Sequence, residues 1–178
     1  MSAKPLLSTV DIVRLENDME IKSFESEDKD LNDFLLRDAK NYSSSLLAVT
    51  YVLQVGDETV AYFSLSNESL IKNDDEKPIW NKINRFIPND KRRRSYPAVK
   101  IARLAVAKKY ANMGLGRHTI LAIKGMFTNE PQRAGCRFLV VDAYRGALPF
   151  YQKNYFKFFT EQDCNDDTRI MYFDLKAI

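Results

Sequence analysis

The sequence has little of the chemistry that builds metal sites and disulfide frameworks, with two cysteines and one histidine among its 178 residues. Two thiols cannot form a disulfide framework or a four-thiolate metal site. The single histidine, His118, excludes any mechanism that needs two imidazoles, and we expect no bound metal. A Cys–His pair is arithmetically available, but lone cysteines usually behave as small buried hydrophobes. We expect both thiols to be reduced, with Cys136 packed beside a strand and Cys164 exposed in a polar turn.

A long apolar run and a strong net charge are also absent. A membrane-spanning helix needs about 20 apolar residues, whereas the most apolar segment, 46–55, is interrupted by Thr50 and Gln54. No stretch near the start is typical of a signal peptide, so we expect a cytoplasmic protein with no membrane partner. Lys and Arg number 27 against 24 Asp and Glu, a net charge of +3. Nucleic-acid binding would therefore have to depend on a local patch.

The remaining composition is that of one globular domain, with 45% apolar and 29% charged residues, and we expect a single domain over residues 1–178. Segments with β-prone composition alternate with segments whose apolar residues recur at helical spacing. Strands are expected at 10–15, 47–55, 60–66, 98–106, 138–143, 155–160 and 169–175, and helices at 27–42, 78–87, 116–127 and 146–154. The strand–helix–strand order from 98 to 143 predicts two parallel strands joined by a crossover helix. The predicted fold class is α/β with a mixed sheet.

The most informative segment follows the strand at 98–106. A loop containing Gly114 and Gly116 opens the next helix, so the backbone N–H groups of Met113 to Arg117 can bind an anion such as a pyrophosphate. Taken alone, this spacing fits equally well a tight turn before a helix. The third glycine and downstream acid of a dinucleotide fingerprint are not in register, and no Gly-Lys-Ser/Thr of a P-loop follows.

Two segments together carry a resemblance to a known family. The stretch RLAVAKKYANMGLGR (103–117) resembles the acetyl-coenzyme-A signature of the GNAT family of N-acetyltransferases, and VVDAYRGALPFYQKNYF (140–156) is similar to the family's later strand, helix and closing strand. The resemblance implies one GNAT-type domain, with a central twisted mixed sheet flanked by helices and a splayed pair of parallel strands that holds acetyl-coenzyme A. It implies that the co-substrate is bound by Leu104, Ala105, Val106, Asn112, Met113, Gly114, Leu115, Gly116 and Arg117.

The implied reaction is direct transfer of an acetyl group to a primary amine. Tyr151 matches the family tyrosine that protonates the departing thiolate, although it also fits a simple aromatic anchor beside Phe150. Glu68 is the candidate general base, but an exposed glutamate without a role is an open alternative, and the amine can instead lose its proton to solvent. An N–H group near Val106 is the expected donor to the oxyanion.

Three positions depart from the family pattern. Ala111 stands where Arg or Gln is usual, with Asn112 or Arg117 as replacements; Tyr144 stands where Asn is frequent, and Tyr155 where Gly is usual. Each departure can weaken co-substrate binding or reshape the acceptor pocket. A non-catalytic binding module with the same fold is therefore the alternative from a different functional class.

A narrower resemblance concerns the acceptor. The segment FESEDKDLNDFLLRDA (24–39) is similar to the opening of toxin acetyltransferases from toxin–antitoxin pairs, which implies aminoacyl-tRNA as acceptor and an antitoxin partner. The basic run Lys91 to Arg94 is either a solvated loop or a phosphate-binding surface for the 3′-phosphate of coenzyme A or for RNA. The acceptor amine stays open between a small molecule, a peptide and aminoacyl-tRNA. A homodimer also stays open.

Overall fold

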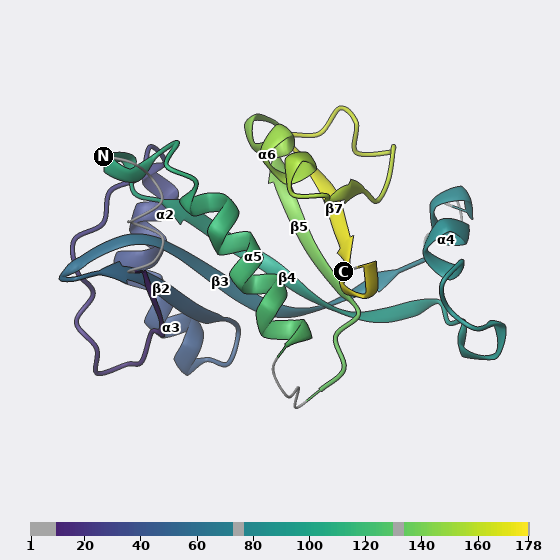
Figure 1. Ribbon diagram of the computed structural model, residues 1–178, viewed down its shortest axis with the longest axis horizontal. Helices are drawn as coiled ribbons and strands as arrows, with labels where there is room; N and C mark the ends of the chain where they lie inside the picture. The colour runs from purple at the N-terminus through teal and green to yellow at the C-terminus, as the bar shows by residue number, and fades with distance from the viewer. Residues whose placement is uncertain (1–9, 73–76, 130–133, 178) are drawn as a thin grey trace. The chain divides into compact units, whose positions relative to one another are not determined.

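The computed structural model describes residues 10–72, 77–129 and 134–177 and shows a mixed α/β fold (Figure 1). The described strands form one seven-stranded sheet in the order β1-β2-β3-β4-β5-β7-β6. Their bounds are β1 Asp11–Arg14, β2 Val49–Val55, β3 Glu58–Ile71, β4 Ser95–Val106, β5 Phe138–Tyr144, β6 Lys157–Phe158 and β7 Thr168–Asp174. The predicted fold class, a mixed sheet flanked by helices, is confirmed.

The helices fall close to the predicted segments. The α-helices are α2 Lys29–Asp33, α3 Ala39–Ser44, α4 Lys77–Asn84, α5 Leu115–Thr128 and α6 Leu148–Lys153. One π-helical turn, η1 Phe34–Asp38, joins α2 to α3, and short 3-10 turns are η3 Asn89–Lys91, η4 Lys108–Tyr110, η5 Arg145–Ala147 and η6 Leu175–Ala177.

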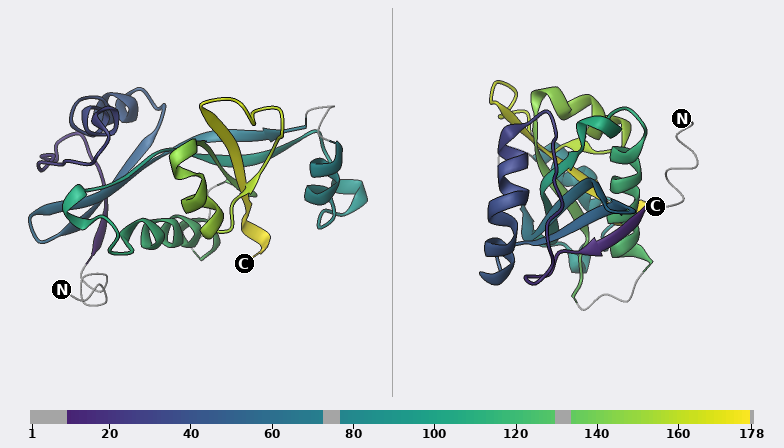
Figure 2. Two further views of the ribbon diagram at one scale, coloured as in Figure 1. Left: turned by 90° about the horizontal axis from the view of Figure 1, so that it is seen from above. Right: turned by 90° about the vertical axis from the view of Figure 1, so that its left-hand side faces the viewer.

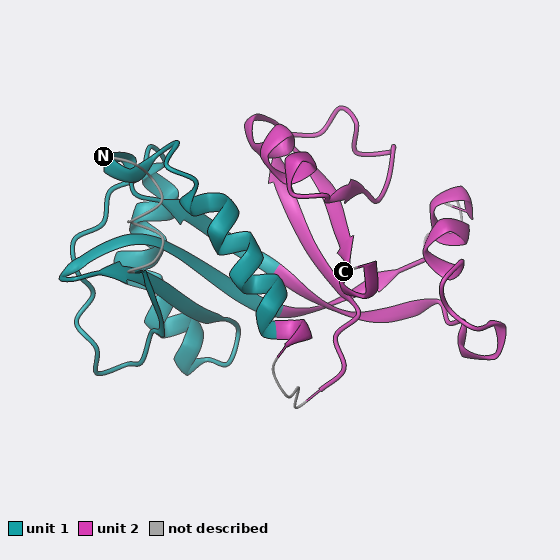
Figure 3. Ribbon diagram, viewed as in Figure 1, with its two compact units in different colours: residues 1–66, 101–126 teal, residues 67–100, 127–178 magenta. Residues whose placement is uncertain are grey.

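The chain divides into two compact units, each assembled from two separate stretches of sequence (Figure 3). Unit 1 comprises residues 1–66 and 101–126, and unit 2 comprises residues 67–100 and 127–178. The chain passes from one unit to the other within β3, β4 and α5, so neither unit is a continuous segment. A single domain over the whole chain stays a prediction.

In unit 1, helices cover both faces of the β2–β3 hairpin, with α2 and α3 on one face and α5 on the other (Figure 2). The hairpin turns at Gly56, whose φ of +57° suits glycine, as the Gly-Asp pair at 56–57 predicts. On the α2–α3 face, Val52 and Tyr62 pack with Phe34 and Leu35. Residues that alternate with them along the strands, Leu53 among them, are buried on the opposite face.

The first helical segment begins as the sequence predicts but changes its winding in the middle. The Asp28 carboxylate accepts hydrogen bonds from the N–H groups of Asp30 and Leu31, at 2.9 and 3.3 Å, so of the two aspartates that the sequence offers as caps, Asp28 and Asp30, Asp28 is the N-cap. The Ala39 N–H then bonds to the Phe34 carbonyl, five residues back. This wider turn was not predicted, because the apolar spacing alone does not distinguish a π-helical turn from an α-helical one.

Unit 2 is built around a cluster of aromatic rings. Trp80 of α4 stacks on Tyr96 of β4, with ring centroids 5.3 Å apart, and Tyr96 contacts Phe138 of β5 at 6.0 Å. Phe159 and Tyr172 complete the cluster. These contacts hold the short helix α4 against the sheet, because its buried side chains belong to this core.

The parallel pairing of β4 with β5 confirms the predicted crossover unit. The ladder joins Ala98 to Phe138, Val99 to Leu139 and Lys100 to Val140. On its other side β5 pairs with β7 along its full length, from Phe138↔Asp174 to Tyr144↔Thr168. A splay of β4 from β5 beyond the ladder stays a prediction.

Two predicted strands had the wrong bounds, and the buried face of α5 is wider than predicted. The strand expected to end at 66 continues as β3 to Ile71, so Glu68 lies inside a strand. The strand expected at 155–160 shrinks to Lys157–Phe158, because Tyr155 adopts a left-handed backbone conformation. In α5 the buried side chains include Leu115, Thr119 and Lys124 as well as the predicted Ile120 and Ile123, and burial lowers the pKa of Lys124 to about 8.

Tyr62 provides a test of the unit 1 core. Its hydroxyl donates a hydrogen bond to the Leu31 carbonyl at 2.7 Å, and burial raises the pKa of the phenol above its ordinary value near 10. Above about pH 10 the unfolded chain releases this proton while the folded chain retains it, so the free energy of unfolding falls as pH rises. We expect Tyr62→Phe to lower the free energy of unfolding at pH 7 by about 1 kcal/mol.

The same variant should lose less stability between pH 9 and 11 than the parent chain, as measured by urea unfolding at each pH. An equal decline in both proteins would contradict the assignment of this titration to Tyr62.

Candidate active site

The predicted anion-binding segment forms a loop with two residues in the left-handed backbone conformation, and it runs directly into the longest described helix. Asn112 and Gly114 have φ values of +62° and +85°, and α5 begins at the next residue, Leu115. Ala111, Asn112 and Gly114 are exposed. The first N–H groups of an α-helix have no partner within the helix and carry partial positive charge. The loop therefore leads directly into a helix N-terminus of the kind that binds a phosphate. Within the loop, the Met113 N–H already donates to the Tyr110 carbonyl at 3.4 Å.

Gly114 is needed for its backbone conformation. At φ +85° an L side chain is strained, yet a Cβ atom added there would meet nothing within 4 Å. The space around Gly114 is thus free of other described residues, and a pyrophosphate can approach the loop backbone. Gly116 differs from Gly114, because it lies in the first turn of α5 without a positive φ. The residues present fit the diphosphate of acetyl-coenzyme A.

The other predicted co-substrate residues take different positions around this loop. Leu115 is 1% exposed, so its side chain belongs to the core. Met113 and His118 are half-buried, and the His118 N–H donates to the Gly114 carbonyl at 3.0 Å. Asn112 and Arg117 are both exposed, as a replacement for the side chain missing at Ala111 requires.

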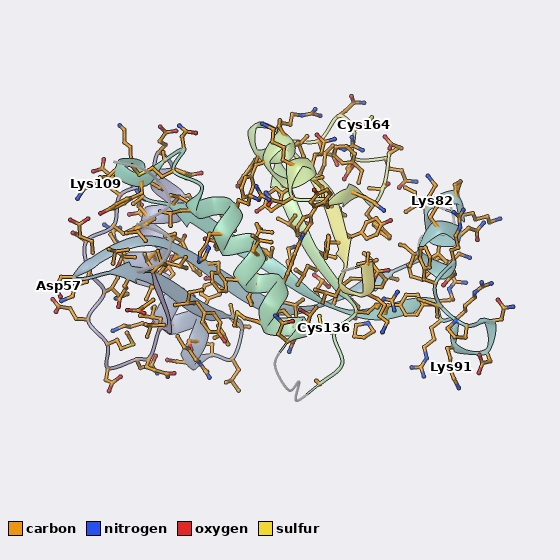
Figure 4. The ribbon with its side chains drawn as sticks, in the orientation of Figure 1. Asp57, Lys82, Lys91, Lys109, Cys136 and Cys164 are labelled. Carbon is orange, nitrogen blue, oxygen red and sulfur yellow. The ribbon has the colours of Figure 1, made fainter. Side chains whose placement is uncertain are left out.

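A cluster of three side chains supports the start of the loop. The Lys109 ammonium lies 2.8 Å from both carboxylate oxygens of Glu58, and the Tyr110 hydroxyl donates to the same carboxylate. Lys109 is labelled in Figure 4. The hydrogen bond from Lys109, followed by that from Tyr110, lowers the pKa of the Glu58 carboxyl. The cluster fastens η4 to the β2–β3 hairpin within unit 1, although its exposure limits its energetic value.

The end of β4 that precedes the loop is also fixed within unit 1. Ala105 is buried in the core beside Phe34 and Tyr62, while Leu104 and Val106 are half-buried. The Ala107 N–H donates to the Val60 carbonyl at 2.9 Å. The structure therefore brings the segment Leu104 to Val106 and the loop Met113 to Arg117 into one continuous supersecondary element.

Tyr151, the candidate acid, lies in α6 of unit 2. It is 6% exposed, and its ring makes edge-to-face contacts with Phe150 and Phe156 at 5.1 and 5.4 Å. Burial raises the pKa of its phenol above the ordinary value. No hydrogen bond from the described residues engages its hydroxyl. The side chain is therefore an aromatic anchor through its ring, with a hydroxyl that is still available as a donor.

The end of α6 explains why the family pattern has glycine at position 155. The Tyr155 N–H donates to the Gln152 carbonyl at 2.9 Å, and the Phe156 N–H donates to the Tyr151 carbonyl at 3.0 Å. These two bonds form a Schellman motif, which requires a left-handed residue where Tyr155 stands, at φ +67°. The Phe156–Tyr151 ring contact is the hydrophobic contact that usually accompanies the motif. This helix end therefore fixes both the backbone and the ring of Tyr151.

Glu68 and Tyr144 are exposed residues of unit 2. The exposed Glu68 carboxylate accepts a hydrogen bond from the Ser69 N–H at 2.9 Å. Tyr144 ends β5 with 61% of its surface exposed. Two residues earlier, Asp142 forms an ion pair with Lys100, which belongs to the last pair of the β4–β5 ladder. The role of Glu68 as a base stays a prediction.

Arg103 is a residue of the unit 1 site region that sequence reasoning missed. Its guanidinium lies over the Phe34 ring at 5.2 Å and donates to the Ala102 carbonyl at 2.8 Å. Its Nε is buried without a hydrogen-bond partner among the described residues. The one signal in the sequence that places Arg103 near this core is the strand alternation, because Arg103 and Ala105 are two residues apart and share a face of the strand.

In residues 10–72, 77–129 and 134–177, no group of three His, Cys, Asp or Glu side chains could hold a metal ion. None of the helices in these ranges has the length and apolar character needed to cross a bilayer. Cys136 is half-buried and Cys164 exposed, as predicted.

Comparison with solved structures defines the class of fold. The chain has the fold of solved bacterial toxins, AtaT and KacT among them, which confirms the predicted GNAT-type fold. No family model matches the sequence, and no curated protein matches it.

The individual matches cover nearly the whole chain at low identity. A bacterial toxin crystal structure matches with a TM-score of 0.77 and 15% identity, over 94% of this chain and 92% of that chain. A tyrosine-to-phenylalanine variant of the toxin AtaT gives 0.74 and 16%, over 95% and 91%. A similar variant of KacT gives 0.71 and 19%, over 95% and 96%. Other structures show AtaT with acetyl-CoA, with its antitoxin AtaR and with acetyl-methionyl-tRNAfMet.

The loop at Gly114 allows a charge-specific test of anion binding. Gly114→Glu places a carboxylate beside the exposed amides, and we expect it to weaken acetyl-coenzyme A binding at least 100-fold in calorimetric titration. Gly114→Gln carries the same backbone strain and size without the charge, so it should bind more tightly than the Glu variant. Equal affinities of the two variants would show that strain, and not charge, is responsible.

The helix end at Tyr155 gives a stability prediction. Tyr155→Gly should raise the free energy of unfolding by up to about 1 kcal/mol, because glycine adopts the left-handed conformation without steric cost. Tyr155→Ala retains that cost and serves as the control in urea unfolding. If Ala stabilises the protein as much as Gly does, the backbone conformation is not the reason.

Proposed function

We propose that the protein is an acetyl-coenzyme-A-dependent N-acetyltransferase that transfers an acetyl group directly to a primary amine. The observation that carries this proposal is the loop of left-handed residues at Asn112 and Gly114, which opens onto the N-terminus of α5. The fold adds support, because the chain shares it with the toxin AtaT, which has been solved with acetyl-CoA.

Within this proposal, the chain's own backbone binds the co-substrate. The N–H groups of Met113 to Arg117 hold the diphosphate, and the backbone of Leu104 and Val106 pairs with the pantetheine arm as an added strand would. Bound acetyl-coenzyme A supplies the activated thioester. A neutral amine forms the new C–N bond as the C–S bond breaks, and the N–H group near Val106 stabilises the oxyanion.

Tyr151 is the proposed acid. Its raised pKa keeps the phenol protonated at neutral pH, so it can donate a proton to the departing thiolate. The proton lost by the amine goes to solvent or to Glu68. No described residue competes for the hydroxyl of Tyr151, which supports this role. Because a phenol of high pKa is a weak acid, the hydroxyl must lie within hydrogen-bond reach of the departing thiolate.

The acceptor that we favour is the amine of an aminoacyl-tRNA. AtaT has been solved with acetyl-methionyl-tRNAfMet, and this chain carries a basic segment at Lys91–Arg94. An antitoxin partner is part of the same proposal, since AtaT has been solved with AtaR and KacTA with DNA. Small amines and peptides are alternative acceptors, and a homodimer is an additional proposal.

Tyr151→Phe tests the reaction. We expect acetyl-coenzyme A to bind with unchanged affinity while turnover falls about 100-fold or more, because general acid catalysis contributes about 10²–10⁴. Tyr172→Phe removes the hydroxyl of another buried tyrosine in unit 2 and should leave turnover unchanged. Unchanged turnover of Tyr151→Phe would remove that residue from the mechanism.

The same assay separates the enzyme from a non-catalytic module. The substrates are acetyl-coenzyme A with a panel of small amines, peptides and aminoacyl-tRNAs. Absence of transfer to every acceptor by the parent protein, with acetyl-coenzyme A bound, would favour a binding module with this fold.

A further inference from the structure

The connection between α4 and β4 in unit 2 is held together by a network of hydrogen bonds. The Arg92 guanidinium donates to the carbonyls of Ile87 and Asn84 at 3.2 and 3.3 Å. The Tyr96 hydroxyl donates to the Asn84 side chain at 2.7 Å and accepts from the Arg93 N–H at 3.0 Å. Residues 84–87 and 92–93 are therefore held side by side, and the loop has a defined shape.

Phe86 projects from this hydrogen-bonded loop into solvent. It is 72% exposed, whereas Trp80, Ile83 and Ile87 on the same segment are 3%, 3% and 9% exposed and belong to the core. The fold therefore does not use the Phe86 ring for packing. A large aromatic side chain on a rigid, exposed loop is available to bind something else.

The sequence segment that carries this ring is basic. The exposed cations of the segment include Lys82, Arg85, Lys91 and Arg93, and the only acidic residue from 77 to 94 is Asp90, which pairs with Lys91 at 3.2 Å. Figure 4 labels Lys82 and Lys91 beside α4 and η3. Arg92 is different, because its guanidinium is engaged with carbonyls of the α4 end.

We propose that Phe86 and these cations form a binding platform for single-stranded RNA, in which a base stacks on the Phe86 ring while Arg85, Lys91 and Arg93 contact phosphates. Single-strand sites combine cationic surfaces with exposed aromatic rings in this way. The platform deepens the proposed function, because it rests on the aminoacyl-tRNA acceptor: the unpaired end of that RNA is single-stranded. An anionic membrane fits less well, since α4 spans only Lys77–Asn84 and the segment after it exposes one large apolar ring, Phe86.

The structure divides the basic run Lys91–Arg94 by role. Neutralising Arg92 should lower stability, because the carbonyls of Asn84 and Ile87 lose their donor. Arg93 instead presents its side chain to solvent while its N–H is bonded to Tyr96. The RNA-binding test must therefore leave Arg92 in place.

The experiment measures binding of a fluorescently labelled, unacylated 12-nucleotide RNA by anisotropy, without acetyl-coenzyme A. Phe86→Ala should weaken binding about 10-fold or more, and Phe86→Tyr should retain it. Arg85→Gln with Arg93→Gln should weaken binding and reduce the salt slope by about 0.7 for each cation. Leu121→Ala removes an exposed apolar side chain of α5 in unit 1 and is the matched control with no expected effect.

The proposal is overturned if Phe86→Ala binds the RNA as tightly as the parent chain does. It is equally overturned if Phe86 is required for binding phosphatidylserine vesicles or a polyglutamate peptide but not RNA. Gly114→Glu should leave RNA binding unchanged, so loss of acetyl transfer and loss of RNA binding can be told apart. Thermal unfolding of each variant checks that the fold is intact.

Discussion

The left-handed backbone between Tyr110 and Leu115 is the constraint on which the candidate site depends. Two residues with positive φ, Asn112 and Gly114, turn the chain from the end of β4 into α5, whose first amides have no partner within the helix. Glycine and asparagine are the residues that adopt this conformation most readily, so the sequence supplies a suitable residue at both positions. The anion site is thus a property of the backbone, supported by the Glu58–Lys109–Tyr110 cluster, and the absence of a side chain at Ala111 does not remove it.

The same conformation ends two other helices, with residues that are less suited to it. Leu46 after α3 and Tyr155 after α6 both have positive φ and both complete Schellman motifs. Leu46 is 93% and Tyr155 74% exposed. At Tyr155 the strained turn lies directly after the helix that carries Tyr151, and its two hydrogen bonds fix the backbone of the candidate acid. Local strain here is offset by the ring contact of Tyr151 with Phe156.

Aromatic packing in unit 2 places the basic segment. The contacts of Trp80 with Tyr96 and of Tyr96 with Phe138 fasten α4 to the sheet, and the Tyr96 hydroxyl joins the two arms of the loop. One tyrosine thus serves the core through its ring and the loop through its hydroxyl. Phe86 lies outside this core, on a basic segment of the sequence.

The sequence by itself determined the α/β class, the parallel crossover, a helix cap at Asp28 or Asp30 and the position of the glycine-containing loop before α5, because each follows from local periodicity or from short motifs. It did not determine the π-helical turn at Phe34, the length of β3 through Glu68 or the left-handed turn at Tyr155, where tertiary packing overrides local preference. The division of roles between Arg92 and Arg93 was likewise decided by the fold. Adjacent arginines are chemically identical in a sequence, and only the carbonyls that surround them distinguish one that caps a helix from one that faces solvent.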